Sequence, residues 1–162
     1  MKRRHVPSKV ELIAKLHRGL RPKLDDAQLR DLALVHAANL DTICNGGGTN
    51  AVLYDIVAGV LTWSRVAELL ATGVDEMTEQ LRMVERVVAR YIKHKRVAFD
   101  GPDYQTAKRG LDIMDALAAI ADRATAIAAA DWSEHRMNEM AADGKLRCAV
   151  QLAGAVREGE PA

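Results

Sequence analysis

The sequence predicts an all-α fold, a single-domain bundle of five to seven helices around a buried central helix at about residues 49–72. Apolar residues recur every three or four positions along most of the chain, and no segment alternates apolar and polar residues with a period of two. The stretches that separate these periodic segments are short, as they are in helical bundles. With 162 residues, 49% of them apolar and 28% charged, the chain is long enough for one well-packed domain.

The stretch from Thr49 to Ala71 is the most apolar part of the chain, and we expect the other helices to pack around it. A first set of residues recurs at helical spacing and defines one apolar face: Val52, Ile56, Gly59, Val60, Trp63, Ala67 and Leu70. A second set widens this face: Leu53, Val57, Leu61, Val66 and Leu69. Four residues are left for water: Asp55, Ser64, Arg65 and Glu68. A helix that is apolar over most of its circumference is typical of a bundle interior.

Residues 1–24 form a basic N-terminal segment that differs in charge from the rest of the chain. They hold eight Lys and Arg residues and one acid, a formal charge of +7, and the remainder carries −6. A capping-box pattern, Ser8 followed by Glu11, predicts a short helix within this segment. We place the helical bundle in residues 25–157 and expect residues 158–162 to form a frayed tail.

The next predicted helix begins after Asp25, an N-cap residue with Gln28 at the third helical position, and runs to about Cys44. Its expected inner face consists of Leu29, Leu32, Leu34, Val35, Leu40 and Ile43. The run Asn45-Gly46-Gly47-Gly48 ends this helix, because consecutive glycines adopt non-helical backbone angles freely. Thr49 then caps the central helix.

The helix after the central one is predicted to be capped by Asp75 and to end in the basic run Lys93-His94-Lys95-Arg96, where the helix dipole favours cations. Its expected inner face consists of Met77, Leu81, Val84, Val87, Val88 and Tyr91.

Two further helices are predicted beyond the turn Asp100-Gly101, the first with Pro102 at its first position. The inner face of the first consists of Ala107, Leu111, Met114, Leu117, Ala118 and Ala121. A break at residues 123–125, with Thr125 as a candidate cap, separates it from the second. The inner face of the second consists of Ile127, Trp132, Met137 and Met140. A last short helix is expected over residues 146–156.

No motif in the chain indicates a catalytic, metal or cofactor site. The run Asn45-Gly46-Gly47-Gly48 precedes a helix N-terminus, where amides can hold an anion, but a P-loop also needs a preceding strand and a Gly-Lys-Ser/Thr ending. A flexible connector is therefore favoured over an anion site. The five histidines have no His or Cys three or four positions away, so no helical metal pair is predicted. A zinc site assembled from distant residues stays open as a weaker alternative, and we expect no cofactor.

Reactive residue types are also present without a reactive arrangement. Cys44 is placed at the C-terminal end of a helix, where the dipole raises the pKa of a thiol and makes it a poor nucleophile. Ser133 and His135 are neighbours on one helical turn and cannot face each other as in a hydrolase. Asp55 is an acid in apolar company that would need a partner if buried, and His36 is expected to be hydrogen-bonded at the edge of the core. We therefore expect no enzymatic activity.

Basic residues form a stripe on the helix that follows the central one, because they are spaced by three or four positions. With the start of the chain, they give the candidate contacts to nucleic acid or a partner: Lys2, Arg3, Arg4, Arg82, Arg86, Arg90 and Lys93. The alternative is a solvated face on which Arg82 and Arg86 pair with Glu79 and nearby acids. The sequence pI of about 7.8 favours this alternative, because nucleic-acid-binding domains are typically more basic.

The sequence also predicts a cytoplasmic protein without a membrane anchor. Cys44 and Cys148 are far apart, which indicates no disulfide framework and fits a reducing compartment. The apolar runs are too short and too often interrupted by charge to span a bilayer. The basic start is not followed by an apolar segment of the signal-peptide type.

Three stretches resemble a group of short all-helical proteins of unknown function that are encoded on plasmids, integrative elements and prophages of proteobacteria. These stretches are Thr62-Trp63-Ser64-Arg65-Val66, Asp100-Gly101-Pro102, and the run from Ala130-Asp131-Trp132 to Met140. The resemblance covers about residues 30–140 and leaves out the basic N-terminus. It implies an accessory role in a mobile element, with no catalytic residues to carry over.

Two functional hypotheses follow. The first is a non-enzymatic helical interaction or regulatory protein that forms a homodimer or binds a partner protein, because the chain has an excess of apolar helical faces and an Ala- and Met-rich last third. The alternative is a nucleic-acid-binding accessory protein that uses the basic N-terminus and the stripe that begins at Arg82. An enzyme ranks third.

Overall fold

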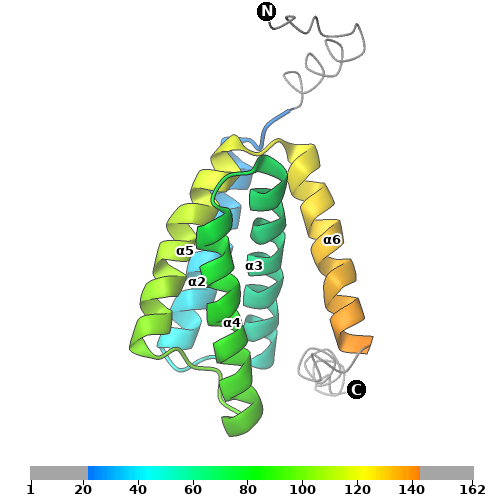
Figure 1. Ribbon diagram of the computed structural model, residues 1–162. Coiled ribbons are helices and arrows are strands. Elements are labelled where there is room, and N and C mark those ends of the chain that lie inside the picture. The colour runs from blue at the N-terminus through cyan, green and yellow to red at the C-terminus, as the bar shows by residue number, and fades with distance from the viewer. Residues whose placement is uncertain (1–21, 143–162) are drawn as a thin grey trace, which may run out of the picture.

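The computed structural model describes residues 22–142, and within this range the chain forms five α-helices and no strand (Figure 1). The helices are α2 (Asp26–Cys44), α3 (Asn50–Leu70), α4 (Val74–His94), α5 (Gly101–Ile120) and α6 (Arg123–Ala142). The predicted all-α class is confirmed. The short helix predicted in the basic N-terminal segment, the helix predicted over residues 146–156 and the frayed tail lie outside the described residues.

Helices α2 to α5 are arranged side by side, and α6 lies along α3 on the outside of this group (Figure 1). Both α2 and α4 pack against α3 and α5. Helix α3 packs against each of the other four described helices, whereas α6 packs extensively only against α3. The start of the described chain is tied to the start of α6, because the backbone N–H of Arg123 donates to the carbonyl of Pro22 at 2.9 Å.

The core of the bundle is built on α3. Its buried apolar side chains are Leu53, Val57, Val60, Trp63, Val66 and Ala67. Two expectations on this helix are wrong, because Leu69 is 50% exposed and Ser64 is buried. Ser64 can lie inside because its hydroxyl donates to the carbonyl of Val60 at 2.7 Å, which leaves no polar group unpaired. Asp55 is exposed and therefore needs no charged partner.

Two predicted N-caps, Asp25 and Thr49, are confirmed. The Asp25 carboxylate accepts the N–H of Gln28 at 2.9 Å, and the Gln28 side chain accepts the N–H of Asp25 at 3.1 Å, which completes a capping box. Thr49 caps α3 through its hydroxyl. The N-cap of α5 is Asp100, which accepts the N–H of Asp103 at 2.8 Å and was not among the predicted caps.

The starts of α4, α5 and α6 differ from the expectation. Gly73, with a φ of 70°, is the N-cap of α4 and lets the chain reverse within a few residues, so that Asp75 lies in the first turn instead of capping it. Pro102 is the second residue of α5 and not the first. The cap of α6 is supplied by Asp122, whose carboxylate accepts the N–H of Thr125 at 2.7 Å.

Two residues of the expected inner face of helix α2 point away from the core, whereas Leu29, Leu32, Leu40 and Ile43 face it as predicted. Leu34 and Val35 are 66% and 53% exposed, and His36 lies on the inner side instead. The reason is helical spacing, because the inward stripe consists of Leu29, Leu32, His36, Leu40 and Ile43. Residues 34 and 35 are rotated away from this stripe.

Helix α6 is also rotated relative to the expectation. Ile127 is 52% exposed and Trp132 is 37% exposed, whereas Met137 is buried as expected. The inward positions next to Met137 are Ala129 and Ser133, one turn apart. These small side chains let α6 approach α3 closely, and the Ser133 hydroxyl donates to the carbonyl of Ala58 on α3 at 3.1 Å.

Candidate functional site

The cationic stripe predicted on α4 divides into paired and unpaired residues. Asp103 in the first turn of α5 is buried, with 1% of its side chain exposed. Its Oδ1 accepts from Nε of Arg86 at 2.9 Å and from Nη2 of Arg86 at 2.7 Å, and its Oδ2 accepts from Nη2 of Arg90. Arg90 also donates to Asp100. Together, Arg86, Arg90, Asp100 and Asp103 form a group that joins the two helices, and we call it the α4–α5 clasp.

The electrostatics of the clasp favour its charged form. Burial by itself lowers the pKa of Arg90, but the hydrogen bonds and charges of Asp103 and Asp100 outweigh burial and raise it. The pKa of Asp100 is lowered, first by the backbone N–H of Asp103 and then by the Arg90 guanidinium. The expectation that the stripe's arginines pair with acids therefore holds for Arg86, although its partner is Asp103 on α5 and not Glu79.

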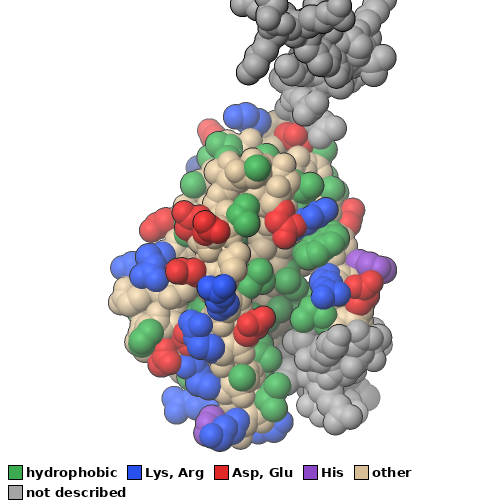
Figure 2. All heavy atoms as spheres, viewed as in Figure 1, with side chains coloured by type: hydrophobic (Ala, Val, Ile, Leu, Met, Phe, Trp, Pro, Cys, Tyr) green, Lys and Arg blue, Asp and Glu red, His purple; other side chains and the backbone are tan. Residues whose placement is uncertain are grey.

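Other cations on α4 and α5 remain exposed. Arg82 and Lys93 form no ion pair with another described residue, while Lys2, Arg3 and Arg4 lie outside the part of the chain that the structure describes. We use the term basic face for six exposed cations. Two lie on α4, two directly follow α4 and two lie on α5: Arg82, Lys93, Lys95, Arg96, Lys108 and Arg109. Lys and Arg side chains gather over these two helices in Figure 2. The sequence offered no sign that Lys108 and Arg109 would join the predicted stripe.

A second surface feature is an apolar groove of about 460 Å³ between α2 and α6. Its apolar lining consists of Leu24, Leu32, Val35, Ala126, Ile127 and Ala130. Gln28, Asp31 and Arg123 add polar groups to the lining. Val35 and Ile127 are more than half exposed, so this groove presents apolar surface to solvent. Sequence reasoning missed it because Val35 and Ile127 were both assigned to the core.

The interior of the bundle holds one polar pair that the apolar pattern did not reveal. The Trp63 indole Nε1–H donates to Nε2 of His36 at 3.0 Å. His36 is therefore a neutral imidazole with its proton on Nδ1. Burial lowers the pKa of His36, and the Asp115 carboxylate opposes this effect only in part. This hydrogen bond agrees with the expectation that His36 is a hydrogen-bonded residue at the core edge.

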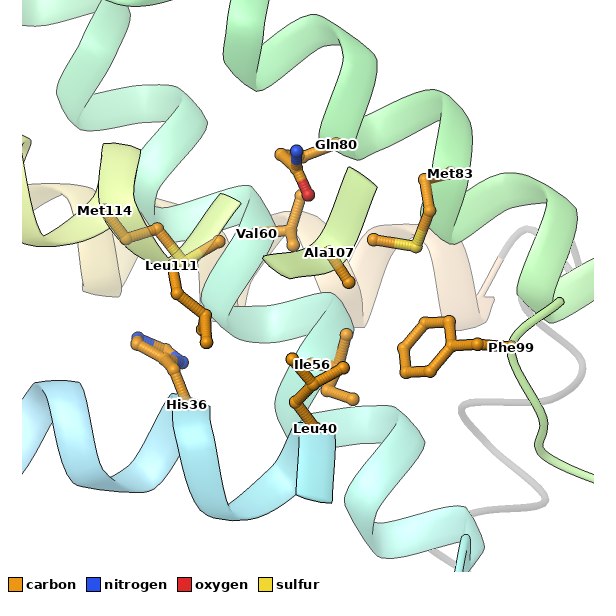
Figure 3. A pocket seen from close by; sticks show the side chains of 10 residues that line it. All are labelled: His36, Leu40, Ile56, Val60, Gln80, Met83, Phe99, Ala107, Leu111 and Met114. Carbon is orange, nitrogen blue, oxygen red and sulfur yellow. The ribbon is translucent and has the colours of Figure 1, made fainter. Parts of the chain in front are cut away.

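His36 and Gln80 line a small, partly open cavity with apolar neighbours from four helices (Figure 3). The Gln80 amide donates to the carbonyl of Thr106 at 2.9 Å, so its N–H group is satisfied. The cavity volume is about 30 Å³, far below the roughly 300–1,000 Å³ of small-molecule sites. A space of this size has room for about two water molecules and for no larger ligand.

Two helical glycines leave room for these buried polar side chains. A Cβ placed on Gly59 of α3 would lie 2.7 Å from Cε1 of His36. A Cβ placed on Gly110 of α5 would lie 2.4 Å from Oε1 of Gln80. Both distances are shorter than van der Waals contact, so each glycine permits a close approach that alanine would obstruct.

The remaining candidates for chemistry are not brought together. Cys44 lies beside an open hollow of about 430 Å³ that Arg96 and Tyr104 also line. Partial burial, and after it the nearby Asp41 carboxylate, raise the pKa of the Cys44 thiol, which keeps it protonated. Ser133 faces α3, whereas His135 is exposed and contacts Glu139 at 3.4 Å. Within residues 22–142, no three His, Cys, Asp or Glu side chains are grouped as metal ligands.

The glycine run between α2 and α3 serves packing at this end of the bundle. Gly46 adopts a φ of 79° in the turn after α2. A Cβ on Gly48 would lie 2.8 Å from the carbonyl oxygen of Val97, so the connection between α4 and α5 passes close to this glycine.

Among the helices that the structure describes, none is long and apolar enough to cross a bilayer. No protein-family model, no curated protein and no solved structure matches this chain.

Proposed function

We propose that this protein is a non-enzymatic interaction protein that works through protein–protein contacts, and that its partner in the α2/α6 groove is a second copy of the chain. The observation that carries the proposal is the groove itself. It combines about 460 Å³ of open volume with exposed apolar side chains on both of its walls. Removing such surface from water is the main driving force of protein association.

The composition of the groove favours a second copy as the partner. Asp31 and Arg123 both line it, carry opposite charges and form no ion pair with each other. A surface with an apolar centre and both signs of charge can be complementary to itself across a two-fold axis, as isologous dimers require. Leu34, on the same helix as Val35, is 66% exposed and adds to the apolar surface of α2.

The one-sided packing of α6 also supports an additional partner on this side. Helix α6 packs extensively only against α3, although it is 20 residues long. Its outward residues include Ile127 and Trp132, and the Arg65 guanidinium lies over the Trp132 ring in a cation–π arrangement, 5.4 Å from the ring centroid. A second copy would cover the side of α6 that faces α2.

The resemblance to helical proteins of mobile elements suggests the setting of this activity. We propose an accessory or regulatory role in a bacterial mobile element, carried out in the cytoplasm. The weak similarity of residues 30–140 is the support for this setting, and the groove is the support for the mode of action.

Light scattering after size-exclusion chromatography tests the proposal. The native chain should have twice its mass of 17.7 kDa. The variant Val35→Asp/Ile127→Asp should be a folded monomer, because it places carboxylates in the apolar centre of the interface. The matched control Leu69→Asp/Ile92→Asp changes two side chains that are each 50% exposed outside the groove, and it should remain a dimer.

A monomeric native chain would refute self-association. The wider proposal of a protein-binding role then depends on a photo-crosslinker at position 35 in the host cell. If that position cross-links neither the chain itself nor one reproducible protein, the protein–protein function is wrong.

A further inference from the structure

Charge within the described part of the chain is strongly segregated. Residues 82–109 hold eight of the thirteen Lys and Arg residues found in residues 22–142, but only three of the eighteen acids. Two of these three acids, Asp100 and Asp103, belong to the α4–α5 clasp. The near-neutral charge of the whole chain therefore hides a local excess of cations over α4 and α5 (Figure 2).

From this surface we propose that the basic face binds the phosphodiester backbone of nucleic acid without reading its base sequence. The inference does not depend on the proposed protein–protein function, because the groove is lined by no residue of α4 or α5. A dimer formed through the groove would leave its basic faces free.

The clasp holds this face in one geometry. Arg86 with Asp103, Arg90 with Asp100, and Gln80 with Thr106 join α4 to α5 at successive levels. These bonds fix the antiparallel register of the two helices, so cations from both are held on a shared surface. Arg86 is itself 54% exposed, so part of its guanidinium also faces solvent. Preorganised cations lose less conformational entropy when they meet a row of phosphates.

The chemistry of the face favours phosphates over an acidic protein. Between residues 82 and 109, Ile92 is the one large apolar side chain that is exposed. Protein interfaces usually contain a buried apolar or aromatic centre, which this face lacks. Phosphate binding needs no such centre, because it is driven by charge neutralisation and the release of counterions. Between residues 82 and 109 the Tyr and Phe rings are half-buried and the exposed ring is the small imidazole of His94, so the face favours contacts with the backbone over base stacking.

Fluorescence anisotropy with the full chain and a short labelled DNA duplex of arbitrary sequence tests the inference. Binding should be tight at low salt and should weaken linearly on a plot of log K against log salt. The variant Arg82→Glu/Lys108→Glu should bind more weakly at every salt concentration, with a slope smaller by about two. The matched control Arg30→Glu/Arg136→Glu makes the same change in net charge outside the basic face and should keep the slope of the native chain. Melting curves of both variants check that they are folded.

Three results would overturn the inference. One is no binding of the native chain at low salt, and another is equal weakening by both variants, which would show a response to net charge alone. The third is equally good competition by polyglutamate and by unlabelled duplex, which would assign the face to an acidic protein. Duplex RNA as a second labelled probe identifies the source of the phosphates, and equal affinity for RNA and DNA is the result expected of backbone contacts.

Discussion

Replacing Asp103 with asparagine tests whether the α4–α5 clasp holds the two helices together. Asn has almost the same shape as Asp, so the change removes the charge and leaves the packing intact. The carboxylate accepts hydrogen bonds from both Arg86 and Arg90. An amide can accept with its oxygen only, and its NH2 group would face a guanidinium donor.

The magnitude follows from the burial of each partner. Removing one partner of a fully buried ion pair costs about 3–5 kcal/mol. Asp103 is 1% exposed, but Arg86 and Arg90 are 54% and 32% exposed, so water can solvate part of each guanidinium after the change. With this screening, we expect a loss of roughly 1.5–3 kcal/mol in the free energy of unfolding. In a domain of this size, such a loss lowers Tm by roughly 3–12 °C.

Urea denaturation followed by circular dichroism measures this loss. Asp112→Asn on the same helix is the matched control, because Asp112 is exposed and forms no ion pair with another described residue. The control should change stability by less than about 0.5 kcal/mol. If Asp103→Asn stays within the same limit, the clasp does not hold α4 to α5, and the geometry inferred for the basic face loses its support.

Three further predictions concern the interior. Trp63→Ala should lower the free energy of unfolding by about 3–5 kcal/mol in a denaturant titration, since the ring is 3% exposed; a loss below about 1 kcal/mol would mean that the ring is not enclosed. Gly59→Ala should destabilise the fold despite its higher helix propensity, because the new methyl group meets His36, and adding His36→Ala should recover part of the loss. Burial lowers the pKa of His36 below its ordinary 6.5, so the unfolded chain takes up a proton at a higher pH than the folded chain does. The free energy of unfolding should therefore fall as the pH drops from about 6.5 to the pKa of the folded state. The variant His36→Gln should flatten this part of the curve of stability against pH, and an unchanged slope would show that His36 does not cause it.

Features set by local chemistry were predictable from the sequence. The capping box at Asp25 and Gln28 involves residues three positions apart, so it does not depend on the rest of the fold. The apolar run around Gly59 also predicts its own burial, because apolar residues cover most of the circumference of this helix and leave little of it for polar residues. The cap at Thr49 is also local, since its hydroxyl accepts the amide N–H of Val52, only three positions further along.

Features that depend on a neighbouring helix were not predictable. Helix α6 is rich in alanine, which fits inside or outside, so its rotation is decided by small residues that pack on α3 and not by Ile127 or Trp132. A serine in a helical pattern is normally assigned to the exposed face. Ser64 and Ser133 are nevertheless buried, because each hydroxyl donates a hydrogen bond to a backbone carbonyl of α3. The partner of Arg86 lies on another helix, 17 positions away, and no spacing rule links the two. The groove lies between α2 and α6, and the sequence pattern of neither helix alone predicts it.

Hydrogen exchange measured by mass spectrometry at low and high protein concentration tests the α2/α6 interface most directly. Raising the concentration should slow amide exchange in peptides that cover α6 and residues 30–38, because a second copy protects these elements. Exchange in α4 and α5 should stay the same. Exchange that is independent of concentration in α6, or slowing confined to α4 and α5, would contradict an interface built on the groove.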